Sequence, residues 1–312
     1  MSGPVPLSEA LRDARAVLAR AGVPTPQADA ELLAAFLIGR EHGVAMSRGE
    51  VQAAVVLGHV APDGLSALVA RRARRVPLQH LTGTAPFRGL DLAVGPGVFV
   101  PRPETEQVAE RAIAEAREVM TRHGQVLVAD LCTGSGAIAL AIVHEVPGAV
   151  VHAVELDAHA HAWAVRNVAA VGAGVVLVRG DARSALAQLD GTVDVVVSNP
   201  PYVPPGAVPV DPEVADHDPA VALYGLGPDG LEVPRGIVAA AGRLLRTGGL
   251  LVMEHAEVQA AAVRQMVAAT GVFEQVSTSV DLTGRDRMVL ARRSAGVSGV
   301  GTSQQDVEHS PS

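Results

Sequence analysis

The segment Asn199-Pro200-Pro201-Tyr202 carries the residue types most suited to chemistry in this chain. It follows an apolar run, Val193 to Val197, that is interrupted only by Asp194 and predicts a buried strand. Two consecutive prolines have no N–H to donate, so the strand must end there. In open α/β sheets, ligands bind at the carboxyl ends of strands. An amide, two carbonyls held by rigid rings and an aromatic face predict a clamp for a planar group that carries an NH2.

A glycine-containing loop is the second segment that suggests a ligand. A predicted strand ends at Asp130, and an Ala-rich helix begins near Ala137. Backbone N–H groups of such a loop can approach a ligand closely, with a helix N-terminus behind them. A glycine loop alone is equally compatible with a plain turn. The candidate cofactor contacts here are Asp130, Cys132, Thr133, Gly134, Ser135 and Gly136.

The ends of two further strands carry acidic residues. Glu155 ends the strand that follows the glycine loop, at about the 20-residue spacing that lets a carboxylate accept both ribose hydroxyls of a nucleoside cofactor. The next predicted strand is followed by Asp181 and Ala182, and the Asp181 carboxylate is a candidate acceptor for an adenine amino group. Four successive loops at one sheet edge therefore indicate a nucleoside cofactor beside the clamp.

The elements that must position these loops follow an alternating pattern from Thr105 to Arg293. Strand-like runs, several of them separated by helix-length segments, predict an α/β fold with a mostly parallel seven-stranded sheet and helices on both faces. The expected strands are Val126–Asp130, Val150–Glu155, Val175–Arg179, Val193–Ser198, Gly249–Glu254, Phe273–Val280 and Arg287–Arg292.

The rest of the chain divides into three parts. Residues 1–82 predict a small helical domain, with a first helix capped by Ser8 and ended near Gly22, and further helices over residues 27–38 and 64–75. Residues 83–104 alternate between apolar and polar side chains around Gly and Pro, which predicts a β-hairpin and a linker into the 105–293 domain. Residues 294–312 are rich in Ser and Gly without periodicity, so we expect disorder there.

Composition excludes several classes of protein. A single cysteine excludes a disulfide framework and a thiolate zinc site, and His159 and His161 do not share a helix face, so we expect no metal. The net charge of −8 argues against direct binding of nucleic acid. No apolar run is long enough to span a bilayer and no signal peptide is evident, so we expect a cytoplasmic protein without a membrane partner.

Several ordered segments make the chain resemble class I S-adenosylmethionine-dependent methyltransferases, and among them the release-factor glutamine N5-methyltransferases, once described as HemK proteins. The resemblance runs from about Arg71 to Arg292. The segments that carry it, besides the glycine loop and Ser198–Tyr202, are Arg75–Leu81 with Phe87–Leu90, Phe99–Glu106, Gly227–Leu231 and Asp281–Arg287.

This resemblance implies a Rossmann-like domain with an N-terminal substrate-recognition domain, and a definite reaction. S-adenosylmethionine would give its methyl group to the side-chain amide nitrogen of the glutamine in the Gly-Gly-Gln motif of class I peptide-chain release factors, leaving S-adenosylhomocysteine. In this family the clamp asparagine and the carbonyl of the following proline accept the two amide hydrogens. Those roles fall to Asn199 and Pro200, and Tyr202 would pack against the flat amide beside Pro201. Asn199 would also contact the cofactor. We expect a monomer.

Three positions depart from the family pattern. Cys132 stands where glycine is usual, so the loop must tolerate a side chain and other backbone dihedrals there. Glu155 replaces the commoner Asp. Ala182 replaces a residue that is often bulky or aromatic, so we expect adenine stacking either to be weaker or to come from Phe99. The run Arg71, Arg72, Arg74 and Arg75 is interpreted as a solvated helix face.

Three alternatives stay open. A ribosomal-protein glutamine methyltransferase would use the same clamp. An adenine N6 DNA methyltransferase would use a similar one, because adenine also offers a conjugated NH2, but it would need a basic surface. A protein-binding module that has lost its cofactor is the third, and the intact clamp and Glu155 argue against it.

Overall fold

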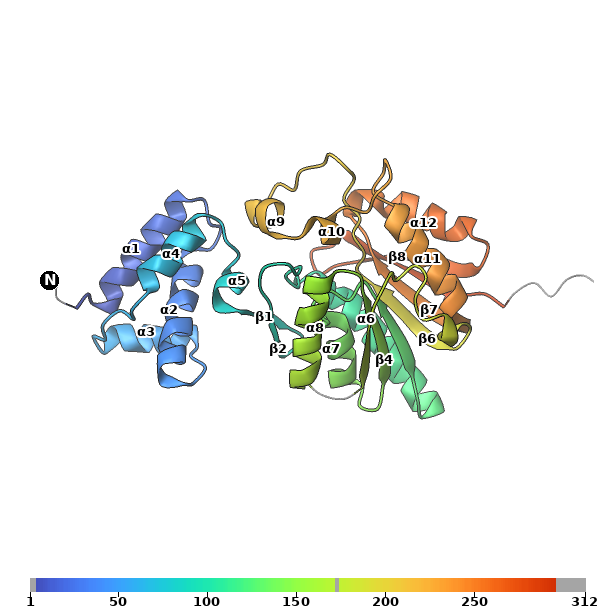
Figure 1. The fold of residues 1–312 in the computed structure, drawn as a ribbon, viewed down its shortest axis with the longest axis horizontal. Coiled ribbons are helices and arrows are strands. Elements are labelled where there is room, and N and C mark those ends of the chain that lie inside the picture. Colours follow the sequence, from blue (N-terminus) through green and yellow to red (C-terminus); the bar gives the residue numbers. More distant parts are fainter. Residues whose placement is uncertain (1–3, 172–173, 296–312) are drawn as a thin grey trace, which may run out of the picture.

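The computed structural model describes residues 4–171 and 174–295, and all but the first two residues of the predicted disordered tail lie outside the described part. Figure 1 shows a helical body (blue) beside a twisted sheet with helices on both faces. The N-terminal body packs five helices around its own core, in which Leu7, Leu18 and Leu33 are fully buried. These helices are α1 (Leu7–Arg20), α2 (Pro26–His42), α3 (Arg48–Val56), α4 (Leu65–Ala73) and α5 (Leu78–Thr82).

Two details of the helical prediction were wrong. Ser8 lies inside α1, whose N-cap is Pro6, so it does not cap the helix. Helix α3 was missed although its start carries a capping box, in which Ser47 Oγ accepts from the Glu50 N–H at 3.3 Å and the Glu50 carboxylate accepts from the Ser47 N–H at 2.7 Å. A Ser followed three residues later by Glu is a recognised start signal, so the sequence contained this helix.

The predicted hairpin is confirmed, as β1 (Thr84–Phe87) paired antiparallel with β2 (Leu90–Ala93). Its Phe87 and Leu92 side chains are buried in the core of the sheet domain. Residues 94–104 then continue without a strand into α6 (Thr105–His123). The hairpin therefore packs with the sheet domain. The residues that follow it bring Phe99 and Thr105 to the carboxyl ends of the strands.

The predicted seven-stranded, mostly parallel sheet is confirmed, with the order β5-β4-β3-β6-β7-β9-β8. Only β9 runs against its neighbours in this sheet. The strands are β3 (Leu127–Leu131), β4 (Val150–Glu155), β5 (Val175–Arg179), β6 (Val193–Ser198), β7 (Leu245–Glu254), β8 (Phe273–Val280) and β9 (Asp286–Arg293).

Helices cover both faces of this sheet. Val195 and Val197 of β6 pack in one core with α6 and α7 (Ala137–Glu145), while Val196 packs in the opposite core with α11 (Glu232–Leu244) and α12 (Ala260–Ala269). Helix α8 (Ala158–Val171) follows β4, and the short 3-10 turns are Ala187–Leu189 and Glu257–Gln259. Burial on both faces explains why β6 is an almost continuous apolar run.

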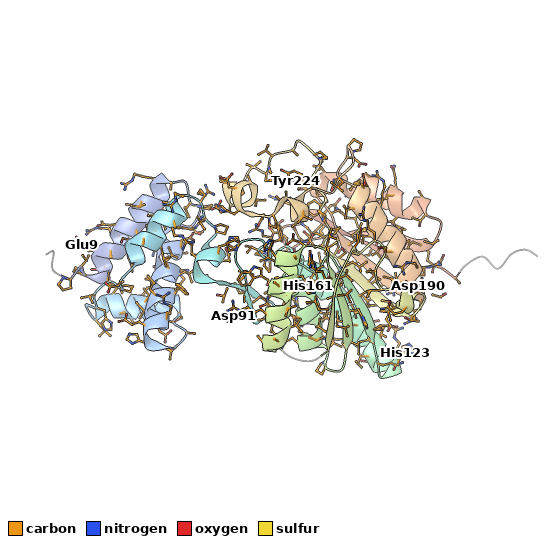
Figure 2. All side chains as sticks on the ribbon, viewed as in Figure 1. Glu9, Asp91, His123, His161, Asp190 and Tyr224 are labelled. Carbon is orange, nitrogen blue, oxygen red and sulfur yellow. The ribbon has the colours of Figure 1, made fainter. Side chains whose placement is uncertain are left out.

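An insertion of residues 199–231 separates β6 from α11 and contains α9 (Pro212–His217) and α10 (Ala220–Leu223). The insertion folds back on its own start, because the Val203 N–H donates to the Leu223 carbonyl at 2.8 Å and the Gly225 N–H to the Val203 carbonyl at 3.1 Å. Tyr224, labelled in Figure 2, follows α10 at this fold-back. The clamp is therefore the first turn of an insertion whose two ends are hydrogen-bonded to each other.

A buried ion cluster joins the helical body to the insertion. Arg72 of α4 is 5% exposed and contacts Asp29 of α2 at 2.7 Å and Glu213 of α9 at 2.6 Å. Arg75 also binds Glu213, and it reaches Asp211 at 3.1 Å. The interpretation of the arginine run as a solvated face is thus wrong for Arg72 and Arg75, because the acidic partners come from distant parts of the chain.

We expect Arg72→Ala to lower the free energy of unfolding by about 3 kcal/mol, because Asp29 and Glu213 would stay buried without their partner. The measurement is urea denaturation followed by circular dichroism. Arg71→Ala, the exposed neighbour, is the control and should change stability by less than about 0.5 kcal/mol. Equal small effects in both variants would show that the cluster adds no stability.

Candidate active site

A cavity of about 840 Å³ lies at the carboxyl ends of β3, β4, β6 and β7. It brings together residues from Phe99 to Arg287, as expected for an open α/β sheet. Twelve of the fourteen predicted site residues line it: Phe99, Cys132, Thr133, Gly134, Ser135, Glu155, Asp181, Ala182, Asn199, Pro200, Pro201 and Tyr202.

The other two predicted residues, Asp130 and Gly136, shape the glycine loop from behind the cavity. Asp130 is fully buried, and its Oδ2 accepts from Thr133 Oγ1 at 2.5 Å and from the Ala139 N–H at 3.1 Å. Its Oδ1 has no partner among the described residues, and burial raises the pKa of Asp130 to about 7. Gly136 caps α7 with a φ of +87°, which only glycine adopts readily.

Cys132 has a strained backbone conformation. Its φ is +67°, a left-handed conformation that strains a residue with a Cβ by about 1 kcal/mol or more. Burial raises the pKa of its thiol, with the nearby Glu155 and Asp130 charges adding to the rise. A raised pKa keeps the thiol protonated and so disfavours a role as nucleophile.

The Glu155 carboxylate lies at the end of β4 and keeps part of its capacity free. Its two oxygens accept from the Gly134 and Asp157 N–H groups, each at 2.8 Å. An ionised carboxylate offers about four lone-pair sites, so two remain for a ligand. Burial raises its pKa. At the next strand end, Asp181 binds Arg183 at 2.6 Å, and this contact lowers the pKa of Asp181.

The clamp presents two acceptors that no other described residue uses. The Asn199 side chain donates from Nδ2 to Thr105 Oγ1 at 3.3 Å. Among the described residues, no hydrogen bond reaches the Asn199 Oδ1 or the Pro200 carbonyl. Both residues line the cavity, so these oxygens can accept hydrogens from a bound NH2 group.

Two residues beside the clamp were missed in the sequence. Glu254 at the end of β7 is 3% exposed and accepts from Thr105 Oγ1 at 2.8 Å and from the Tyr202 hydroxyl at 3.3 Å. Burial raises its pKa to about 7. Both Thr105 and Glu254 line the cavity. The available signal was that Glu254 ends another predicted strand, Gly249–Glu254, at the same edge of the sheet.

The segment that includes Gly227–Leu231 braces the clamp. A Cβ on Gly225 would lie 2.7 Å from the Pro201 carbonyl oxygen, and one on Gly230 would lie 2.5 Å from that of Tyr202. Gln259 donates to the Tyr202 carbonyl at 2.9 Å and to that of Asp229 at 3.1 Å. The backbone around the clamp is thus packed too closely for any side chain at these glycines.

The segments at either end of the sheet domain serve the same site. Phe99 lies under the Arg102 guanidinium at 5.0 Å from its ring centre, and Arg102 binds the buried Asp218 of the insertion at 2.6 Å. Asp281 binds Arg287 at 3.0 Å, and Arg287 lines the cavity near Glu254. These motifs converge on one cavity although they are far apart in the chain.

The described ranges contain neither a candidate metal site nor a membrane-spanning helix. Over residues 4–171 and 174–295, there is no group of three or more His, Cys, Asp or Glu that could hold a metal ion. His161, labelled in Figure 2, lies on α8 with His159. Within the same ranges, no helix is both long and apolar enough to cross a bilayer.

Two family descriptions match the chain. PrmC N-terminal domain matches residues 9–83, and methyltransferase small domain matches residues 117–212, which include the glycine loop and the clamp. The catalytic domain of hMettl16, solved in complex with an RNA hairpin, superposes with a TM-score of 0.50 over 76% of this chain and 84% of that one, at 16% identity. That likeness concerns the fold alone.

Relatives extend over nearly the whole chain. A release factor glutamine methyltransferase of Mycolicibacterium smegmatis is 48% identical over 93% of this chain and 98% of its own length, and that of Streptomyces coelicolor is 48% identical over 88% and 94%. A 4-amino-L-phenylalanine/4-methylamino-L-phenylalanine methyltransferase of Streptomyces pristinaespiralis is 40% identical over 87% and 90%. By its identity to the first two and its matched domains, the chain belongs to the release factor glutamine methyltransferase family.

Proposed function

We propose that this protein transfers the methyl group of S-adenosylmethionine to the side-chain amide nitrogen, N5, of the glutamine in the Gly-Gly-Gln motif of class I peptide-chain release factors. The observation that carries the proposal is the pair of free acceptors, Asn199 Oδ1 and the Pro200 carbonyl, in a cavity that also contains the Glu155 carboxylate. A primary amide has two hydrogens to satisfy such a pair.

The residues of the cavity fit S-adenosylmethionine. Glu155 has free lone pairs for ribose hydroxyls, and Phe99 and Ala182 offer apolar surface to a base. Asp130, behind the cavity, holds the glycine loop through its contacts with Thr133 Oγ1 and the Ala139 N–H. A volume of about 840 Å³ is also within the usual range for ligand sites.

When bound, S-adenosylmethionine supplies an electrophilic methyl group on a sulfonium. An amide nitrogen is a weak nucleophile because its lone pair is delocalised into the carbonyl, so the chain must contribute mainly by orientation. Asn199 and Pro200 hold both amide hydrogens and thereby aim the nitrogen, and Tyr202 packs against the amide plane. As the N–CH3 bond forms and the S–CH3 bond breaks, one of the two hydrogens leaves as a proton to water. Orientation of this kind can lower a barrier by roughly 7–11 kcal/mol.

The partner and its setting extend this proposal. We assign release-factor recognition to helices α1 to α5, which are joined to the cavity-lining insertion through Arg72 and Glu213. We also propose that the protein acts as a monomer. Because release factors act in translation, we place the enzyme in the cytoplasm.

The first prediction from the proposed function concerns the glutamine that accepts the methyl group. Purified protein should transfer labelled methyl to a class I release factor, and replacing the acceptor glutamine by glutamate, which has the same shape but no NH2, should abolish the label. The measurement is scintillation counting with site mapping by mass spectrometry. Free 4-amino-L-phenylalanine, the substrate type of one relative, is the competing acceptor and should remain unlabelled. Label on that amine and none on the release factor would reject the proposed substrate.

The second prediction concerns the clamp. Asn199→Ala should lower kcat by about 100-fold, comparable to the loss of one transition-state hydrogen-bonding group in other enzymes. The dissociation constant for S-adenosylmethionine, measured by isothermal titration on the same variant, should change far less than kcat, because the main role of the amide is to orient the substrate NH2. A variant that loses cofactor affinity and keeps kcat would place Asn199 in cofactor binding instead.

The third prediction concerns Glu155. Glu155→Gln should weaken S-adenosylmethionine binding about tenfold, because hydrogen bonds to a charged acceptor are stronger than those to a neutral amide. Isothermal titration measures the change. Glu274→Ala, on the exposed surface of β8, is the control and should bind as the wild type does. Unchanged binding in both variants would remove Glu155 from the cofactor site.

A further inference from the structure

We propose that Thr105 and Glu254 are positioning residues that fix the polarity of the Asn199 amide, so that its oxygen and not its NH2 faces the acceptor nitrogen. This inference rests on the proposed function. It is carried by a chain of hydrogen bonds that starts at the partly buried Asn199 and ends at the buried Glu254, from Asn199 Nδ2 to Thr105 Oγ1 at 3.3 Å and from Thr105 Oγ1 to Glu254 Oε2 at 2.8 Å.

The direction of this chain follows from counting hydrogens. A threonine hydroxyl has one hydrogen, and an ionised carboxylate can only accept. When Glu254 is ionised, the Thr105 hydrogen must therefore point to Glu254. Only the lone pairs of Thr105 then remain for Asn199, so Asn199 must offer its NH2 to Thr105 and turn its oxygen the other way.

This polarity matters because the two ends of a primary amide have nearly the same shape. Packing alone would accept Asn199 in either orientation, but the reversed one would aim N–H donors at the NH2 of the substrate. Two donors facing each other in a buried site leave both without an acceptor. The negative charge of Glu254 removes this ambiguity from a distance of two hydrogen bonds.

Protonation of Glu254 would release the constraint. A protonated carboxyl can donate to Thr105, and the Thr105 hydrogen is then free to bind the Asn199 oxygen. The charged and titratable groups that face Glu254 are Tyr202 from the clamp, Glu104 before α6 and Arg287 of β9. Burial raises the pKa of Glu254 to about 7 although Arg287 favours the ionised form.

The sign of the pH effect follows directly. The ionised form of Glu254 is the one that orients Asn199, so kcat should be highest above this pKa and should fall as the pH drops through it. The amide introduced by Glu254→Gln has no proton to gain in this range, and it can either accept from or donate to Thr105. This substitution therefore removes both the titration and the fixed polarity.

The test compares Thr105→Val, Thr105→Ser and Glu254→Gln with the wild type, using a release factor as acceptor. Thr105→Val keeps the shape and removes the hydroxyl, and it should lower kcat about tenfold with unchanged S-adenosylmethionine affinity. Thr105→Ser should return kcat to within about twofold of the wild type. Thr121→Val, at an exposed position on the same helix, is the matched control and should have wild-type kcat.

The pH profile of kcat separates positioning from a merely structural role. The wild type and Thr105→Ser should lose activity on the acid side of about pH 7, and Glu254→Gln should have a lower kcat without that acid limb. A wild-type kcat in Thr105→Val, or an unchanged acid limb in Glu254→Gln, would overturn the inference. If Thr105→Val does not fold, the Glu254→Gln profile decides. Absence of transfer to the release factor by the wild type would instead reject the proposed function, and this inference with it.

Discussion

The active site depends on one backbone constraint, the turn that Pro200 and Pro201 impose at the end of β6. Neither residue can donate to a neighbouring strand, so the chain must leave the sheet there and the insertion must begin. The insertion closes on this turn through Val203 and Leu223, and Gly225 and Gly230 approach its carbonyl oxygens too closely for a Cβ. The rigid proline rings and the closely packed glycines together hold the Pro200 carbonyl and the Asn199 side chain in the cavity, beside the glycine loop.

The structure contains two sets of buried charged groups with different roles. In the Arg72 cluster every carboxylate has a charged partner, because Asp29 and Glu213 both bind Arg72, and the cluster joins the helical body to the insertion. Among the described residues, the carboxyl groups of Asp130 and Glu254 at the strand ends have no such arginine partner in hydrogen-bond contact, and one oxygen is unpaired. Asp130 Oδ1 has no partner in the described structure, and burial raises the pKa values of Asp130 and Glu254 to about 7. Buried carboxyl groups that lack a full set of partners and have a shifted pKa are typical of functional sites, whereas fully paired carboxylates are typical of structural ion pairs.

Much of the fold could be predicted because the strands are strongly apolar and end at recognisable turns. Strands β4, β5, β6 and β8 begin and end where the sequence predicts, and β7 begins earlier because Leu245 pairs with Val193 before a bulge. Helix α3 and the short helices of the insertion escaped prediction since their periodic signal is short. The left-handed backbone of Cys132 could not be anticipated from a residue with a Cβ, because the surrounding loop imposes it.

The sequence by itself determined which loops form the site, since strand ends of a parallel sheet share one edge and each end carries its own polar residues. It also determined the family, through long ordered motifs. Only the tertiary structure decided how those motifs cooperate. Thr105, Asn199 and Glu254 lie far apart in the chain and meet in one hydrogen-bonded chain, and Arg72 meets Glu213 across two bodies. The physical reason is that a hydrogen bond depends on distances of a few tenths of an ångström, and such distances are set by packing of the whole sheet and not by local residue pattern.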